Sequence, residues 1–168
     1  MMNRAVLLLM MSTLILVGCG NQKNKSINIE VVAIGEGPFF EGSNSLISEV
    51  ELNLSELVGD SELKEITHVT INEISIELDD HEELTFNHFN SAAIQLVSDN
   101  SPMTSIAIMN PIKLSGEELK MTTSEQAEVT SFFQEGKFSL LLDLDFKEDS
   151  YSELLNAEIE INLTLEYK

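Results

Sequence analysis

Hydrophobic and polar residues alternate with a period of two along most of the chain, a pattern typical of β-strands that bury one face and expose the other. The clearest case is Ala157–Tyr167, in which every second residue is hydrophobic and the residues between them are polar. Phe138–Phe146 repeats the pattern, with Leu141 as its exception. Because a helix would mix the two sets of residues on one face, both segments are predicted to be strands.

Five shorter segments carry the same alternation, which brings the predicted strands to about seven. They are Ile27–Val31, Val50–Leu54, Val69–Leu78, Ala92–Ser98 and Met103–Asn110. Within one of them the hydrophobic parity changes at Asn72 and Glu73, which indicates a β-bulge.

Strands that follow one another with little helix between them predict an all-β fold. The expected architecture is an antiparallel β-sandwich of about seven strands, immunoglobulin-like or jelly-roll-like, and a half-open barrel with a helix at its mouth is the alternative. One short helix is expected within Ser124–Gln134, where Thr123 and Gln126 offer a capping box and Gly136 offers a C-terminal stop. A further short helical turn is expected within Leu54–Lys64.

The start of the chain has the composition of a secretory signal peptide. Arg4 supplies positive charge, and Ala5–Val17 forms a nearly unbroken apolar run. A helix of that length spans about 20 Å, which is short of the roughly 30 Å hydrocarbon core of a bilayer. The run is therefore expected to be a cleaved leader and not a permanent transmembrane anchor.

The leader ends in Leu16-Val17-Gly18-Cys19, which resembles the lipobox of bacterial membrane lipoproteins. The resemblance implies that a signal peptidase cuts before Cys19, that its sulfur carries diacylglycerol, and that the new amino group receives an acyl chain such as palmitate. Two or three acyl chains hold a protein durably on a bilayer. The expected organisation is a signal peptide over 1–18, the lipidated cysteine and a polar tether over 19–25, and one folded domain over 26–168.

The residues after the cysteine bear on which membrane holds the protein. In enterobacterial lipoproteins an aspartate at this position retains the protein at the inner membrane, whereas this chain has Gly20. The tether also lacks the acidic run that marks some surface-displayed lipoproteins of Bacteroidota. For a source with two membranes, the resemblance therefore implies the outer membrane, with the domain facing the periplasm. The domain itself is similar to small β-sandwich lipoproteins of Bacteroidota, without a signature that assigns one family.

The charge balance narrows the classes of partner. The chain has 29 acidic and 9 basic side chains, a formal net charge of −20, and cleavage before Cys19 would remove Arg4 and leave −21. A surface this negative repels phosphate backbones and anionic headgroups. Nucleic acid is therefore excluded as a partner, whereas a cationic partner is compatible.

No motif predicts an enzyme. The chain contains no Gly-x-Ser-x-Gly signature, and its one cysteine is assigned to lipid. His68, His81 and His88 have no adjoining catalytic motif, and they are expected to be ordinary surface residues. Tryptophan is absent and tyrosine occurs twice, which disfavours a sugar-cleaving cleft. The expected function is non-enzymatic, with no catalytic residues.

Two acidic clusters contain hard oxygen ligands of the kind that suit Ca²⁺. The candidate ligands are Asp79, Asp80, Glu82 and Glu83 in the first cluster, and Asp143, Asp145, Glu148 and Asp149 in the second. Neither cluster has the spacing of an EF-hand, and no histidine or cysteine pair favours zinc. Because the whole chain is so acidic, both clusters are expected to be solvated surface residues. We therefore expect no cofactor, and a calcium-dependent binding or adhesion domain is the alternative.

One segment departs from the alternation. Residues 35–42 place Phe39 and Phe40 side by side among glycines and a proline. A loop of this kind can display its rings to a partner, or fold them over the end of the domain as a plug, which the cost of exposing paired rings favours. The sequence thus predicts a lipid-anchored binding or assembly module of the cell envelope, with the membrane and an envelope protein as partners. An envelope hydrolase is the third hypothesis.

Overall fold

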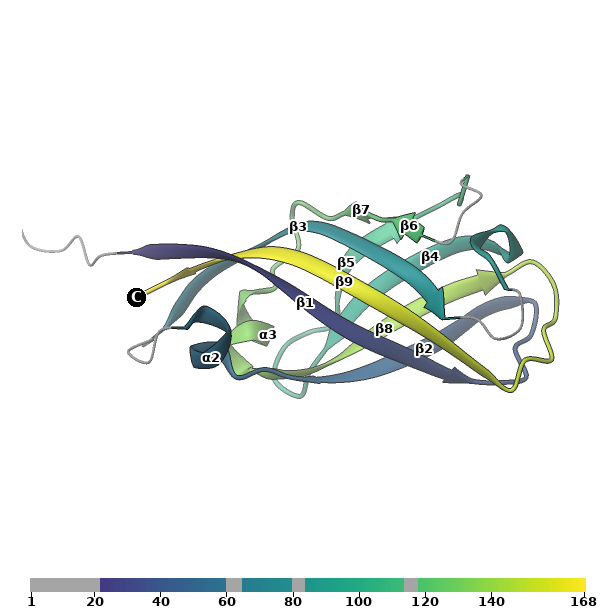
Figure 1. The fold of residues 1–168 in the computed structure, drawn as a ribbon, viewed down its shortest axis with the longest axis horizontal. Helices are drawn as coiled ribbons and strands as arrows, with labels where there is room; N and C mark the ends of the chain where they lie inside the picture. The colour runs from purple at the N-terminus through teal and green to yellow at the C-terminus, as the bar shows by residue number, and fades with distance from the viewer. Residues whose placement is uncertain (1–21, 60–64, 80–83, 114–117) are drawn as a thin grey trace, which may run out of the picture.

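Nine antiparallel strands account for most of the residues that the computed structural model describes, which are 22–59, 65–79, 84–113 and 118–168 (Figure 1). The long strands are β1 (Lys23–Glu36), β2 (Gly42–Glu51), β3 (Ile66–Asp79), β4 (Phe89–Val97), β8 (Lys137–Phe146) and β9 (Leu154–Tyr167). The shorter ones are β5 (Thr104–Met109), β6 (Glu118–Lys120) and β7 (Thr122–Thr123). Hydrogen bonding places them in the order β6-β3-β9-β1-β2-β8-β4-β5-β7. The predicted all-β class is confirmed.

The strand count differs from the prediction because of β6 and β7. Six of the predicted segments coincide with parts of β1, β3, β4, β5, β8 and β9, whereas Val50–Leu54 shares only Val50 and Glu51 with β2 and runs into α2. The strands β6 and β7 have only three and two residues. A strand of that length cannot show a period-two pattern. Met121 separates them, and its backbone N–H donates to the carbonyl of Ile74 over 2.9 Å. Since β6 pairs with β3 and β7 pairs with β5, this segment brings the two ends of the sheet together into a nearly closed, barrel-like arrangement.

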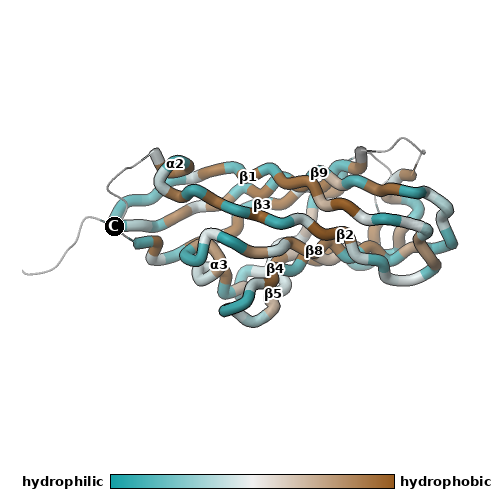
Figure 2. Tube along the Cα trace, turned by 90° about the horizontal axis from the view of Figure 1, so that it is seen from below, coloured by the Kyte–Doolittle hydropathy of each residue, from teal (hydrophilic) through white to brown (hydrophobic). Residues whose placement is uncertain are grey.

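The strands β1 and β2 are joined much more loosely than their neighbours. Pairing between them is limited to Ile34 opposite Ile47 in the described residues, whereas β1 pairs with β9 along its whole length and β2 does so with β8. The two views show β1, β9 and β3 in one layer and β8, β4 and β5 in another (Figures 1 and 2). The side chains between these layers form the core.

The core follows the predicted alternation. Alternate residues of β9 from Leu155 to Tyr167 are buried, as are those of β8 from Phe138 to Phe146, and Figure 2 shows the matching change of hydropathy along the tube. Leu141 lies on the outer face, opposite Ile47. An internal apolar cavity has a volume of about 10 Å³, room for about one water-sized sphere. The interior is therefore packed, and it offers no ligand chamber there.

The parity change in β3 is a bulge, as predicted. The register between β3 and β9 shifts between Ile71 and Glu73, and a second shift lies between Ile66 and His68. The side chain of Asn72, the residue at the first shift, donates to Asn162 Oδ1 over 2.8 Å and to Thr164 Oγ1 over 3.1 Å. The extra residue thus fastens the two strands on their outer face.

Two short helices cover strand edges. The helix α3 (Thr130–Glu135) lies against β3, where Thr130 Oγ1 accepts from the N–H of Val69 and Gln134 Nε2 donates to the carbonyl of Ile66. The helix α2 (Leu54–Val58) lies beside β1, and Lys25 Nζ donates to its last carbonyls. The contacts of α3 satisfy backbone groups of β3 that a free edge would expose, and Lys25 satisfies carbonyls at the end of α2. A 3₁₀ turn, η1 (Phe86–His88), precedes β4.

The predicted helix within Ser124–Gln134 begins later than expected, at Thr130, and its predicted capping box is wrong. Thr123 pairs with Ala107 in the sheet, so it cannot cap a helix, and the residue before α3 is Val129, which makes no side-chain cap bond. The predicted stop is confirmed, because Gly136 has φ 70°, a left-handed conformation that glycine adopts at little cost.

The first described strand begins close to the predicted lipid anchor. β1 starts at Lys23, three residues before the expected domain boundary at Ser26, and Lys23–Ser26 pair with Tyr167–Thr164 of β9. Cys19 and the leader lie outside the described residues. Among the residues that are described, no helix is both long and apolar enough to span a bilayer.

Candidate partner-binding site

The loops that follow β1 and β8 are bonded to each other at the end of the molecule opposite the C-terminus (Figure 1). Phe39 and Ser150 exchange backbone hydrogen bonds of 2.9 and 2.8 Å, and the N–H of Gly37 donates to the carbonyl of Glu153 over 3.0 Å. The N–H of Glu41 donates to Oδ1 of Asp149 over 2.8 Å. These four bonds turn two loops into one short two-stranded frame.

The frame is fixed to the core by the ring of Phe39. This side chain is 3% exposed and stacks on Phe146 with ring centroids 5.2 Å apart and planes 7° from parallel. Phe146 in turn meets Phe89 edge to face at 4.6 Å. Gly37 permits the close approach of the two loops, since a Cβ there would lie 1.8 Å from the carbonyl oxygen of Ser152. The frame is therefore rigidly held.

The outer side of the frame carries exposed hydrophobic side chains. Neighbouring residues of an extended chain point to opposite faces, so the residues beside Phe39 and Ser150 point away from the core. Phe40 is 61% exposed and Tyr151 is 83% exposed, and Pro38 is exposed as well. We call Pro38, Phe40 and Tyr151 the distal tip. Exposed carboxylates of Glu41, Asp149 and Glu153 surround it.

The predicted loop pair Phe39 and Phe40 is thus divided between the two roles considered for it. Phe39 is buried as a plug, and Phe40 is presented at the surface. Tyr151 was not predicted as a site residue. Its neighbours Ser150 and Ser152 gave the sequence signal of a loop, but no local pattern could place that loop beside Phe40, 111 positions earlier in the chain.

The predicted calcium ligands are only partly described. Asp80, Glu82 and Glu83 and the side chain of Asp79 lie outside the described residues. In the second cluster, Asp143 accepts hydrogen bonds from Ser45 and Gln95, and Asp149 accepts from the loop backbone. Asp145 stands further along β8, and Glu148 is exposed in the loop that follows.

No group of three or more histidine, cysteine, aspartate or glutamate residues among the described residues is arranged to hold a metal ion. Several of the predicted ligands lie outside those residues, so the calcium hypothesis stays a prediction.

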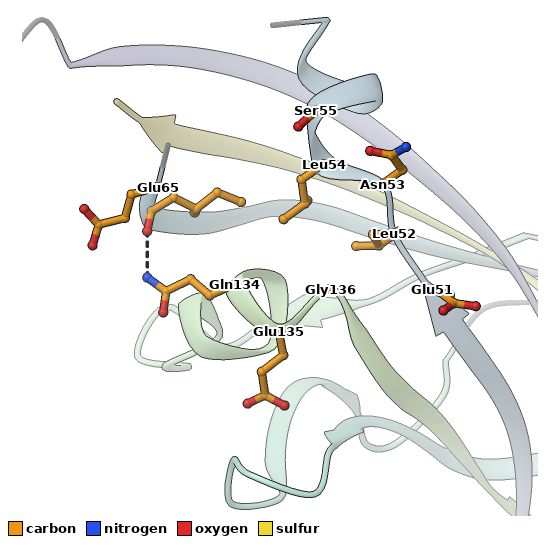
Figure 3. A pocket seen from close by; sticks show the side chains of 10 residues that line it. Glu51, Leu52, Asn53, Leu54, Ser55, Glu65, Gln134, Glu135 and Gly136 are labelled. Carbon is orange, nitrogen blue, oxygen red and sulfur yellow. Dashed lines mark hydrogen bonds between the residues drawn. The ribbon is translucent and has the colours of Figure 1, made fainter. Parts of the chain in front are cut away.

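A larger open depression, of about 810 Å³, is lined by residues of both α2 and α3 (Figure 3). Its lining includes three carboxylates, Glu51, Glu65 and Glu135, which point in different directions (Figure 3). The hydrogen bond from Ser101 Oγ to Glu135, 2.7 Å long, lowers the pKa of that carboxyl group. The three groups do not converge on a common point, so the depression offers no paired acid and base.

Comparison with known proteins does not assign the chain to a family. Neither a protein-family model nor a curated protein sequence matches the chain.

Proposed function

We propose that this protein is a lipid-anchored binding module of the cell envelope, held to a membrane through Cys19 and binding an envelope protein through its distal tip. It acts without catalysis. In a bacterium with two membranes it is anchored in the outer membrane and faces the periplasm. The observation that carries the proposal is the exposure of two aromatic side chains on a rigid frame.

The position of the tip supports this function. β1 begins four residues after Cys19 and leads to the tip. Its 14 residues span about 46 Å at roughly 3.3 Å per residue. A lipid at Cys19 would thus place the tip at the end of the domain remote from the membrane, where a partner reaches it without competing with lipid.

The composition of the tip also favours a protein partner. Aromatic rings dominate the energetics of many interfaces, because burying one large apolar side chain contributes about 1.5–3 kcal/mol. The hydrogen-bonded frame fixes the backbone that carries the rings before binding, which lowers the entropy lost on association. The surrounding carboxylates of Glu41, Asp149 and Glu153 complement a partner with basic residues at its rim.

For the fold, we propose a β-sandwich whose sheets are β6-β3-β9-β1 and β2-β8-β4-β5-β7. The limited pairing of β1 with β2 supports this division, since a continuous sheet would pair them along their length. The segment around Met121 would then cross from one sheet to the other.

The proposal is tested by photo-crosslinking in intact cells of the source bacterium. A benzophenone amino acid replaces Phe40 or Tyr151 in the full chain, and the same group replaces Glu56 or Glu128 as exposed control positions away from the tip. We expect a discrete protein adduct from each tip position and none of that size from the controls. Adding Phe40→Ser to the Tyr151 crosslinker should weaken the adduct. The same adduct from all four positions, or none from the tip, would overturn the proposal.

A further inference from the structure

We propose that a second surface, on the outer face of β1, β9 and β3, binds an extended basic segment of a partner protein. The face contains a groove of about 430 Å³, whose outward side chains are Glu30, Val32, Ser75, Glu77, Glu158 and Glu160. We call this the acidic groove. It is distinct from the distal tip, and the inference holds whether or not the tip binds anything.

Strand register brings like charges face to face in the acidic groove. Glu30 lies directly opposite Glu160, and Glu158 lies opposite Glu77 on its other side. All four are exposed. Like charges in opposed positions destabilise a sheet, so the free protein retains a repulsion that a bound cation would relieve.

The edge of the groove already shows the effect of a cation. Lys120 of β6 stands opposite Ser75 and forms an ion pair of 2.9 Å with Glu73. Its pKa is raised first by the hydrogen bond from its ammonium to Glu73 and by the charge of Glu73, and then by the charges of Glu118 and Glu160. A lysine of a partner would meet the same field.

Exposed hydrophobic side chains beside the carboxylates also suit a basic side chain. Val32 lies opposite Glu158 and is 46% exposed, and Ile34, two residues further along β1, is 49% exposed. Such surfaces accept the aliphatic stems of lysine and arginine.

The spacing of the carboxylates favours an extended chain over a single ion. The described residues contain no cluster that converges on a metal. Carboxylates on adjacent strands are separated by about 5 Å and those two residues apart by about 7 Å, which is also the spacing of alternate side chains in an extended peptide. A segment with a basic residue at every second position therefore matches Glu158 and Glu160 along β9.

The test uses the full chain in non-ionic detergent and a fluorescent peptide of about nine residues that alternates lysine with threonine. Binding is measured by fluorescence anisotropy at physiological ionic strength, at which distant charges are screened. One variant combines Glu30→Gln, Glu77→Gln, Glu158→Gln and Glu160→Gln. The matched control, with the same change in net charge, combines Glu51→Gln, Glu65→Gln, Glu125→Gln and Glu128→Gln.

We expect the groove variant to bind the peptide roughly tenfold more weakly than the parent, because it lacks the four carboxylates that would pair with the lysines of the peptide. The control variant should bind like the parent. Equal weakening in both variants would assign the effect to net charge and overturn the inference, as would the absence of peptide binding by the parent.

Competition separates the peptide from smaller cations. If spermine or Ca²⁺ at the same concentration of positive charge displaces the peptide completely, the groove is a small-cation site and the inference fails. Circular dichroism of each variant checks that it is folded. If the quadruple groove variant does not fold, Glu30→Gln and Glu158→Gln are measured singly, with Glu125→Gln as control. Equal affinity in these three variants would also overturn the inference.

Discussion

Ile34 of β1 and Ile47 of β2 face each other as the residue pair through which these strands are joined, and each side chain is 49% exposed. On either side of this pair the strands diverge in the described structure, although each is fully paired with its other neighbour. The junction between the two strands is therefore loose. Its looseness leaves much of the β1 edge without a strand partner.

The limited pairing of β1 with β2 predicts uneven hydrogen exchange along β1. From Ser26 to Val32, only those amides that point to β9 have a strand acceptor, so every second amide should exchange quickly. The amides of β8 between Ser139 and Asp145 should all be protected, because β8 is paired with β2 and β4. Residue-resolved exchange by nuclear magnetic resonance measures both. Uniform protection of β1 would contradict the proposed two-sheet arrangement.

The alternation predicted β8 and β9 well because burial is decided residue by residue along them, but it missed residues 42–49 of β2. Leu141 broke the pattern for a physical reason, since it belongs to an outer apolar row with Ile47. β6 and β7 carried too few residues to show any period.

The candidate sites were harder to predict because they depend on contacts between distant segments. The sequence does not distinguish Phe39 from Phe40. In the structure Phe39, which is bridged to Ser150, is buried, and Phe40 is exposed. The acidic groove likewise arises from register, which placed Glu30 opposite Glu160 across 130 positions of sequence. Neither the bridge to Ser150 nor the pairing of Glu30 with Glu160 can be predicted from the spacing of residues within one segment.

Phe39→Ala and Phe40→Ala should separate stability from binding. Phe39 is buried and stacked on Phe146, so truncating it should lower the free energy of unfolding by about 3–5 kcal/mol. Phe40 is mostly exposed, and its truncation should change stability by no more than about 0.5 kcal/mol. Urea denaturation followed by circular dichroism gives both values. Equal losses would show that Phe40 is also part of the core.

Gly37→Ala should destabilise the frame beneath the tip. The new Cβ would lie 1.8 Å from the carbonyl oxygen of Ser152, so the two loops must separate. A loss of about 2–4 kcal/mol is expected, in the range of overpacking and broken hydrogen bonds. Gly42→Ala is the control, because its Cβ meets nothing within 4 Å and only the positive φ of 102° opposes it, at about 1–2 kcal/mol. A smaller loss at Gly37 than at Gly42 would refute the close approach of the loops.

Ser101→Ala should reduce stability in a pH-dependent way. Ser101 Oγ donates to Glu135, and this bond is the main cause that lowers the pKa of the carboxyl group below its ordinary value of 4.5. A lowered folded-state pKa stabilises the protein above the ordinary value, and this contribution is lost as the pH falls through the folded pKa. The difference in Tm between parent and variant should therefore be largest near neutral pH and shrink in acid. In a Glu135→Gln background the difference should not vary with pH. If the difference in Tm still varied with pH in the Glu135→Gln background, a titratable group other than Glu135 would be its cause.

Cys19→Ser tests the anchor on which the orientation of the tip depends. Without the thiol no diacylglycerol can be attached, so we expect the variant to take up no label from a clickable palmitate analogue and to retain its leader. Gly20→Asp keeps the thiol and is the control: it should be labelled like the parent, and in an enterobacterial host it should move from the outer to the inner membrane fraction. If the parent itself takes up no label, Cys19 is not lipidated, and the tip loses its assignment as the end remote from the membrane. The rings of Phe40 and Tyr151 would still be exposed, so the crosslinking test would then decide their role without reference to a membrane.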